Sequence, residues 1–274
     1  MPGSHIIMLN RTKSVTVFAI ATVVSPCYVE STGGSWPLIS PLDFLMRKEA
    51  LLDPKPIPLQ SVKSYKKYFV KGIQAHFPQN APLLLSKIET EYQALEGDVR
   101  FAGASKNPMD GRLDFAAYFL SLIKVLDKQG ESFETIRHVS LDIAVAFVQP
   151  RNRVHALLKR LPVKLIGTKL STVLLNVLDR KLSVRGHPDG FVSKIITDKS
   201  ETLGLGYGID ILECGICKLF EKQNYRPFAS ILCEVDLITS NMAGLKLVRS
   251  GTIATGAKKC DFRFQRDTAA PVER

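Results

Sequence analysis

The sequence has few of the residues that would mark a disulfide-rich or metal-rich protein. Among 274 residues there are five cysteines, five histidines and one tryptophan. An odd number of cysteines without paired spacing does not suit a disulfide scaffold, so we expect reduced thiols. The zinc-protease motif His-Glu-x-x-His, the elbow Gly-x-Ser-x-Gly and the phosphate-loop ending Gly-Lys-Ser/Thr are all absent. The sequence therefore excludes these hydrolase and nucleotide-binding signatures.

Residues 1–60 are predicted to form an N-terminal extension or arm, broken by glycines and prolines. Arg11 and Lys13 precede an apolar run from Val15 to Val24, so the segment 11–27 resembles a signal peptide. The run is too short to span a bilayer, and a buried strand is the other interpretation. We expect a cytoplasmic protein, or one of the secretory pathway if this segment is a signal or anchor.

The rest of the chain, residues 61–274, is predicted to be one α+β domain. Apolar spacing favours a helical N-terminal part, packed on a small, mainly antiparallel sheet formed by the C-terminal third. The expected helices cover 61–76, 82–95, 113–129, 132–148, 214–222 and 227–238. The expected strands cover 191–198, 203–212, 245–254 and 258–265. Interior glycines in 203–212 indicate a bulge or a close backbone approach.

Segment 151–185 has almost no acidic residues. It holds nine lysines or arginines and a single acid, Asp179, with leucines at helical spacing between them. Three interpretations stay open: a solvated basic face, a surface that contacts anionic lipid or an acidic partner, and steering of an acidic substrate. Nucleic-acid binding is not expected, because no recognised nucleic-acid motif accompanies the charge. The oligomeric state is left open.

Reactive side chains concentrate between residues 207 and 264, which hold four of the cysteines: Cys214, Cys217, Cys233 and Cys260. Helical geometry places Cys233 and Asp236 about 60° apart on one flank of the 227–238 helix. A thiol and a carboxylate are therefore expected together at the edge of the core. Free cysteines are also often simple core residues, and a four-thiolate zinc site is a further alternative.

This stretch resembles the C-terminal signature of the L-2-amino-thiazoline-4-carboxylic acid hydrolase family. The matching segments follow in order over about fifty residues. They are Cys214-Gly215-Ile216, Cys233-Glu234-Val235-Asp236, Arg249-Ser250-Gly251-Thr252-Ile253-Ala254-Thr255-Gly256 and Cys260-Asp261-Phe262-Arg263-Phe264. Cys217 is not part of the family pattern, and residues 1–60 match nothing in it. The final Gly-x-x-x-Cys-x-Phe is also similar to small-molecule-binding domains of the 4-vinyl-reductase type.

The resemblance implies hydrolysis of a cyclic amidine, with opening of a carbon–nitrogen bond. Water would add at the ring carbon between sulfur and nitrogen, giving an N-carbamoyl cysteine. Such chemistry needs a nucleophile or activated water, an acid for the leaving group and a cation for the substrate carboxylate. The candidate catalytic residues are Cys233, Asp236, Cys214 and His187. The candidate substrate-binding residues are Arg249, Thr252, Asp261, Arg263 and Tyr207. No cofactor or metal is expected.

Two other functions stay open. The same pocket could serve a cyclase or isomerase in a biosynthetic pathway, or the protein could bind a small molecule without catalysis. A dry, elongated, aromatic-lined pocket would favour the cyclase. An apolar pocket with Cys260 alone would favour simple binding. A small pocket on which Cys233, Asp236 and an arginine converge, where the 227–238 helix meets the 245–264 hairpin, would favour hydrolysis.

Overall fold

The computed structural model of the protein describes residues 62–150 and 152–266. The predicted arm 1–60 and its signal-like segment 11–27 lie outside these residues. These residues form eight α-helices and four strands, with short 3₁₀ turns between some of them. The helices are α3 (Val62–His76), α4 (Ala81–Val99), α5 (Arg112–Lys128), α6 (Phe133–Val148), α7 (Arg153–Leu165), α8 (Lys169–Leu182), α9 (Gly215–Lys222) and α10 (Ala229–Met242). The strands are β1 (Val192–Ile196), β2 (Gly208–Glu213), β3 (Leu245–Val248) and β4 (Cys260–Arg266).

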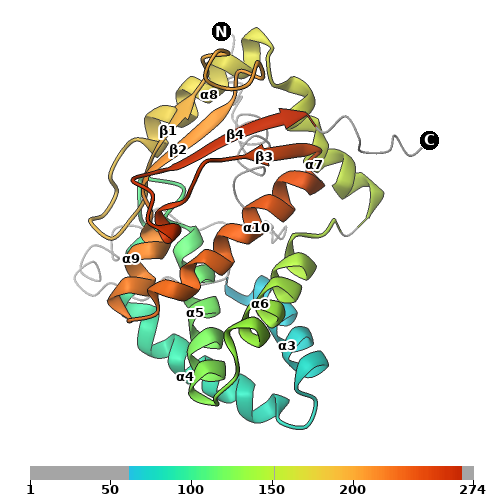
Figure 1. Ribbon diagram of the computed structural model, residues 1–274, viewed down its shortest axis with the longest axis vertical. Helices are drawn as coiled ribbons and strands as arrows, with labels where there is room; N and C mark the ends of the chain where they lie inside the picture. Colours follow the sequence, from blue (N-terminus) through green and yellow to red (C-terminus); the bar gives the residue numbers. More distant parts are fainter. Residues whose placement is uncertain (1–61, 151, 267–274) are drawn as a thin grey trace, which may run out of the picture.

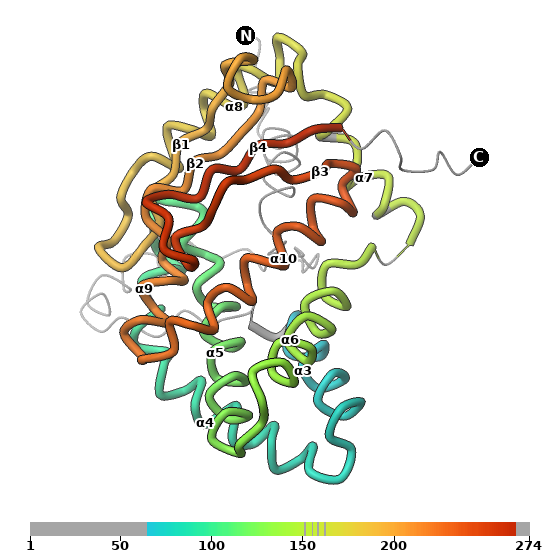
Figure 2. Tube along the Cα trace, in the orientation of Figure 1, coloured from blue at the N-terminus to red at the C-terminus, as the bar shows by residue number. Residues whose placement is uncertain are grey.

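The four strands form one antiparallel sheet in the order β1-β2-β4-β3. The sheet occupies one end of the molecule and α3 to α6 the other (Figure 1). Helix α10 runs between the two halves and contacts both β3 and α6, whereas α8 packs beside β1 (Figure 2). The α+β class, with a helical N-terminal part on a small antiparallel sheet, is confirmed.

Helix α5 is the central element of the helical half. Its residues are buried on almost every side, among them Leu113, Phe119 and Ile123. Ser132 caps the next helix by accepting a hydrogen bond from the amide of Thr135. The helices predicted over 61–76, 113–129 and 132–148 therefore form almost as expected, because each has an apolar face and a clear terminus. Helix α4 runs past its predicted end, since Gly97 lies within it.

Two predicted strands are too long. Residues 203–207, expected at the start of β2, form turns in which Leu203, Gly204 and Gly206 have φ values of 54°, 81° and 75°. A strand cannot contain this left-handed backbone. The expected close approach occurs instead at Gly208, where an added Cβ would lie 3.0 Å from the carbonyl oxygen of Phe262. β3 ends at Val248, and the hairpin connection contains a 3₁₀ turn, η4 (Ile253–Thr255).

A buried asparagine ties α8 and the sheet to the start of α5. Asn107 donates from Nδ2 to the carbonyls of Leu182, Val184 and Phe191, at 2.9 to 3.0 Å. Its Oδ1 accepts from the amide of Met109 at 3.0 Å. One side chain thus satisfies four buried or partly buried backbone groups from three separate segments.

We expect Asn107→Ala to lower the free energy of unfolding by about 2–4 kcal/mol, because several backbone groups lose their partners. Urea denaturation followed by circular dichroism measures this loss. Asn241→Ala, at an exposed position of α10, is the matched control and should change stability by less than about 0.5 kcal/mol. Equal stabilities of the two variants would contradict the assignment.

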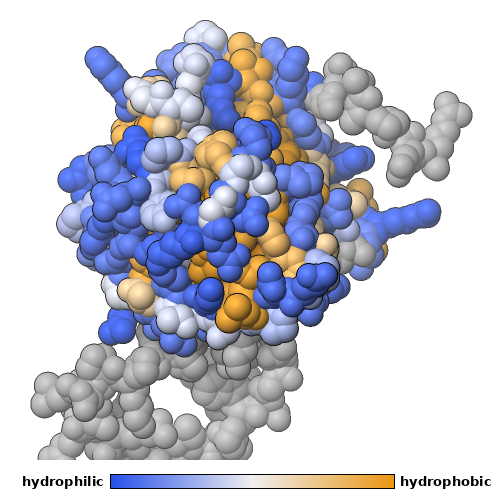
Figure 3. All heavy atoms as spheres, turned by 60° about the horizontal axis from the view of Figure 1, so that its bottom comes forward, coloured by the Kyte–Doolittle hydropathy of each residue, from blue (hydrophilic) through white to orange (hydrophobic). Residues whose placement is uncertain are grey.

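In the described part of the chain, no single helix is long and apolar enough to cross a membrane. The segments Lys159–Leu165 and Lys169–Leu182 reach that length and composition only together, and they meet at an angle of 110°. Apolar residues also reach the surface in a band between hydrophilic ones on the face shown in Figure 3.

Candidate active site

A small cavity lies where α5, α9 and α10 meet the sheet. Its volume is about 80 Å³, below the roughly 300–1,000 Å³ typical of pockets for drug-sized ligands. The lining combines aromatic and aliphatic residues with four thiols, one carboxylate and one guanidinium. The lining residues include Arg112 from α5, Cys214 and Cys217 at α9, Cys233 and Asp236 from α10, and Cys260 and Phe262 from β4. Such a space suits a small metabolite.

Asp236 is the acid of this cavity. Its carboxylate accepts no hydrogen bond from any described residue. Burial raises the pKa of Asp236, while the nearby charges of Arg112 and Arg249 act in the opposite direction. Neither arginine comes within the 4.0 Å of an ion pair with it. The carboxylate is therefore held near two cations without being neutralised by direct contact.

Both arginines keep hydrogen-bond donors without partners. Arg112 Nε and one terminal nitrogen of Arg249, Nη1, are buried and unbonded among the described residues. Arg249 is held by its other terminal nitrogen, which donates to the carbonyl of Cys233 at 3.1 Å. Its guanidinium also lies 5.5 Å from the ring centre of Phe262. Unpaired buried guanidinium N–H groups are costly, and an anionic ligand would supply the partners that these two donors lack.

Four thiols line the cavity, and three of them have raised pKa values. Burial and the charge of Asp236 raise the pKa of Cys233 to about 12, against a smaller opposing effect of Arg249. Burial raises the pKa of Cys260 to about 11. The hydrogen bond with Cys217, together with burial, raises the pKa of Cys214. The lowered pKa that direct attack by Cys233 requires is therefore not found. The expected pairing of Cys233 with Asp236 in one place is found, since both line the cavity.

The cysteines do not form a four-thiolate cluster in the described residues. A metal site would need three or more His, Cys, Asp or Glu side chains with their ligand atoms close together. Among the described residues, one group has all its ligand atoms within 4.8 Å of one another: His76, His138 and Asp142. That group is on α3 and α6, remote in sequence from the cysteines. The zinc alternative for Cys214, Cys217, Cys233 and Cys260 is thus not supported by their placement.

We expect Cys233 to react with iodoacetamide at neutral pH at least about 100-fold more slowly in the folded protein than in the urea-unfolded chain. The reason is that only the thiolate reacts, and its fraction falls as the pKa rises. Peptide mass spectrometry after timed quenching measures the rate. Asp236→Asn removes a charge that raises this pKa and should speed the reaction. Fast alkylation of the folded wild type would contradict the assignment.

His187, the predicted acid–base histidine, does not reach the cavity. Its ring stacks on Phe101 with centroids 3.7 Å apart, and its Nδ1 accepts from the amide of Asp189 at 3.1 Å. The turn that contains it folds against the end of α4 rather than over the sheet. Thr252 is also occupied: its hydroxyl accepts from the amide of Thr255 and caps η4. Neither residue lines the cavity.

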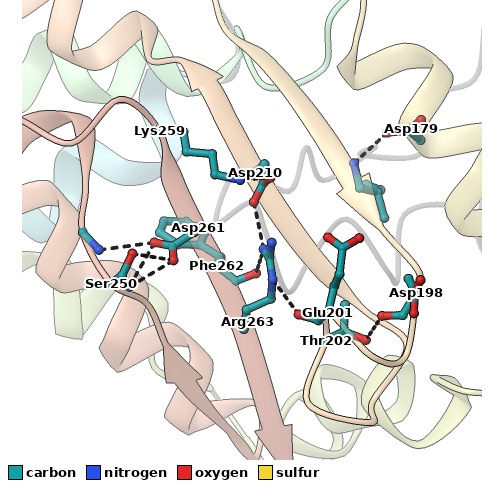
Figure 4. Close-up of polar contacts among 12 residues, drawn as sticks. Asp179, Asp198, Glu201, Thr202, Asp210, Ser250, Lys259, Asp261, Phe262 and Arg263 are labelled. Carbon is teal, nitrogen blue, oxygen red and sulfur yellow. Dashed lines mark hydrogen bonds and ion pairs between the residues drawn. The ribbon is translucent and has the colours of Figure 1, made fainter.

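Asp261 and Arg263 lie away from the cavity and are bound to their neighbours (Figure 4). Asp261 accepts from the amide and hydroxyl of Ser250. Arg263 pairs with Asp210 at 2.8 Å, and Lys259 binds the same carboxylate at 2.6 Å. The strand alternation explains this, because Cys260, Phe262 and Phe264 take the buried face of β4. Neither side chain lines the cavity, and their role in substrate binding stays a prediction.

Tyr207 is fully buried and stacks on Phe264 with centroids 5.1 Å apart. Its hydroxyl has no partner among the described residues. Burial raises the pKa of Tyr207, and the charge of Arg112 partly opposes this. Tyr207 is near enough to Arg112 for its charge to act on the hydroxyl, but it does not line the cavity.

Sequence reasoning missed Arg112. It precedes the signature by about a hundred residues and begins a helix otherwise read as core. A signal was available: Arg112 is a charged residue at the start of a long apolar helix, and charged residues are almost never fully buried unless they are paired. Its proximity to Asp236 depends on the packing of α5 against α9 and the sheet, which local patterns do not encode.

A family model described as L-2-amino-thiazoline-4-carboxylic acid hydrolase matches residues 114–264, more than half of the chain. The match begins within α5, two residues after Arg112, and ends within β4; it includes Cys214, Cys233, Asp236 and Arg249. Searches of curated proteins and of solved structures gave no match.

Proposed function

Because the chain belongs to the L-2-amino-thiazoline-4-carboxylic acid hydrolase family, we propose that it is a hydrolase that opens a small cyclic amidine bearing a carboxylate. The observation that carries the proposal is that Asp236 and Arg112 line one small cavity, with Arg249 close enough for its charge to act on Asp236. A non-catalytic apolar pocket would not need an acid near two arginines that each keep an N–H group without a partner among the described residues. Nor is the cavity lined mainly by aromatic residues, as the cyclase hypothesis required.

The charges of the site complement those of such a substrate. A 2-amino-thiazoline carboxylate carries an amidinium cation and a carboxylate anion on one small ring. The free N–H groups of Arg112 and Arg249 would bind the carboxylate. Asp236 would bind the amidinium, whose positive charge favours the ionised form of this acid. Substrate binding would thus supply the partners that the three side chains lack.

Water is the nucleophile that the thiol pKa values favour. Asp236 would take a proton from a water molecule while the oxygen of that water bonds to the amidinium carbon. The product of this step is a neutral tetrahedral intermediate. The carbon–sulfur or carbon–nitrogen ring bond then breaks. Its electron pair leaves with the sulfur or nitrogen, which takes the proton back from Asp236. Asp236, ionised again, takes the hydroxyl proton as the carbonyl forms and passes it to solvent when the product leaves. Cys233 and its neighbours stay protonated and shape the wall of the cavity.

Atom balance separates the two ring openings. Breaking the carbon–sulfur bond gives N-carbamoyl cysteine with a free thiol, whereas breaking the ring carbon–nitrogen bond gives the S-carbamoyl isomer with a free amine. From the sequence we expect both opening of a carbon–nitrogen bond and an N-carbamoyl product. One reaction cannot give both, because opening the ring carbon–nitrogen bond yields the S-carbamoyl isomer. We propose the carbon–sulfur opening. A thiol has a lower pKa than an amine, so a thiolate is the better leaving group.

Mass spectrometry of purified protein incubated with 2-amino-thiazoline-4-carboxylate tests this function. We expect a mass gain of one water, together with a product thiol detected by a chromogenic disulfide reagent. The ring without its carboxylate, 2-amino-2-thiazoline, is the control and should turn over at least about tenfold more slowly. No turnover of either compound by folded protein would refute the proposed reaction.

A further inference from the structure

Helices α7 and α8 each present apolar side chains to solvent. On α7 these are Val154, Leu157 and Leu161, with exposed fractions of 65%, 57% and 42%. On α8 they are Leu170, Val173 and Val177, with exposed fractions of 60%, 60% and 42%. Both triplets have the spacing i, i+3, i+7, which places each within about 60° on one side of its helix. Each helix therefore has a continuous apolar stripe that packs against nothing described.

The stripe of α8 is separate from the face that holds the helix to the protein. Leu175, Leu178 and Leu182 are buried and form that inner face, together with Ser171. They lie roughly 100° or more around the helix from the exposed stripe. The exposed leucine and valines are thus not the edge of the core, and something outside the described chain is needed to cover them.

Basic residues flank both stripes, and six of them have no partner among the described residues. Arg153, Arg160 and Lys164 on α7, and Lys169, Arg180 and Lys181 on α8, are exposed. None makes an ion pair or side-chain hydrogen bond with any described residue. The one acid of segment 151–185, Asp179, accepts instead from the amide of Ile195 on β1 at 2.6 Å. The charged side chains beside the exposed apolar stripes of α7 and α8 are therefore all cations.

We propose that α7 and α8 form a docking surface for an anionic lipid bilayer, on which they lie in the plane of the headgroups. Exposed apolar residues bordered by lysine and arginine are what such interfacial helices need. Simple steering of an acidic substrate would use the charges but not the six exposed apolar side chains. The 110° angle between the helical segments suits two short helices resting on a surface rather than crossing it.

Sedimentation of the full chain with phosphatidylcholine vesicles, with and without phosphatidylserine, tests this surface. We expect binding only to the anionic vesicles, and weakening as salt is added. Arg160→Gln with Lys164→Gln and Lys181→Gln should weaken it at least about tenfold, since each base near the surface contributes. Leu157→Ser with Val173→Ser should weaken it about tenfold while leaving the fold intact, because both positions are exposed.

Leu83→Ser with Lys87→Gln is the matched control, at exposed positions of α4, and should bind like wild type. Circular dichroism confirms that each variant is folded. Three results would overturn the proposal: no sedimentation with anionic vesicles at low salt, equal binding to neutral vesicles, or equal loss in the control. Self-association that Leu157→Ser with Val173→Ser removes, without vesicle binding, would assign the surface to a second copy of the chain and also overturn it.

Discussion

Asp236→Asn is expected to lower kcat/KM for 2-amino-thiazoline-4-carboxylate at least about 100-fold, the usual contribution of a general base. The amide keeps the shape of the side chain but can neither take a proton nor neutralise an amidinium. Steady-state kinetics by mass spectrometry measures the loss. Glu234→Gln, two residues away on α10 and paired with Arg137 at the surface, is the matched control and should keep its activity.

The same substitution should make the protein more stable at neutral pH. Burial raises the folded-state pKa of Asp236 above its unfolded value, so the ionised acid opposes folding, and this penalty grows as pH rises through the folded pKa. Asparagine removes the penalty. Urea denaturation of wild type and Asp236→Asn therefore should show higher stability for the variant at pH 7 and a smaller difference in acid. Loss of stability together with loss of activity would mean a structural role instead.

Arg249→Met and Arg112→Met are each expected to raise KM about tenfold or more, because each removes a charged donor to the substrate carboxylate. For 2-amino-2-thiazoline, which has no carboxylate, the same variants should change KM little. This substrate comparison separates carboxylate binding from general damage to the site. Arg100→Met, at an exposed residue with no described ion pair, is the control and should leave both substrates unaffected.

The arginine variants should also shift the pH profile in a known direction. Both cations lower the pKa of Asp236, so removing either one raises that pKa. Since the ionised acid is the active form, the acid limb of kcat/KM should move to higher pH. Unchanged KM for the carboxylate substrate together with an unmoved acid limb would refute the role of the pair.

The fold could be predicted from the sequence where one pattern decided one element. Apolar periodicity placed the helices, with Ser132 as the cap of α6, and the alternation of Cys260, Phe262 and Phe264 predicted the buried face of β4. The turn at 203–207 was missed because leucines and glycines alternate there as in a strand. Its left-handed backbone is set by local geometry that alternation does not report.

The candidate site was only half visible in the sequence. Cys233 and Asp236 share one helix, so helical spacing alone brought them together. Arg112 joins them through packing between elements more than a hundred residues apart, which no local pattern encodes. Asp261 and Arg263 lie in the signature but not on the cavity wall, because the face of a strand, and not the position in a motif, decides what a side chain contacts.

A crystal structure of Asp236→Asn with 2-amino-thiazoline-4-carboxylate tests the central claim most directly. The inactive variant should retain substrate in the cavity of α5, α9 and α10. We predict the substrate carboxylate within hydrogen-bond distance of the guanidinium groups of Arg112 and Arg249, with the amidinium beside residue 236. Substrate bound elsewhere, or in the cavity with its carboxylate turned away from both arginines, would contradict the account.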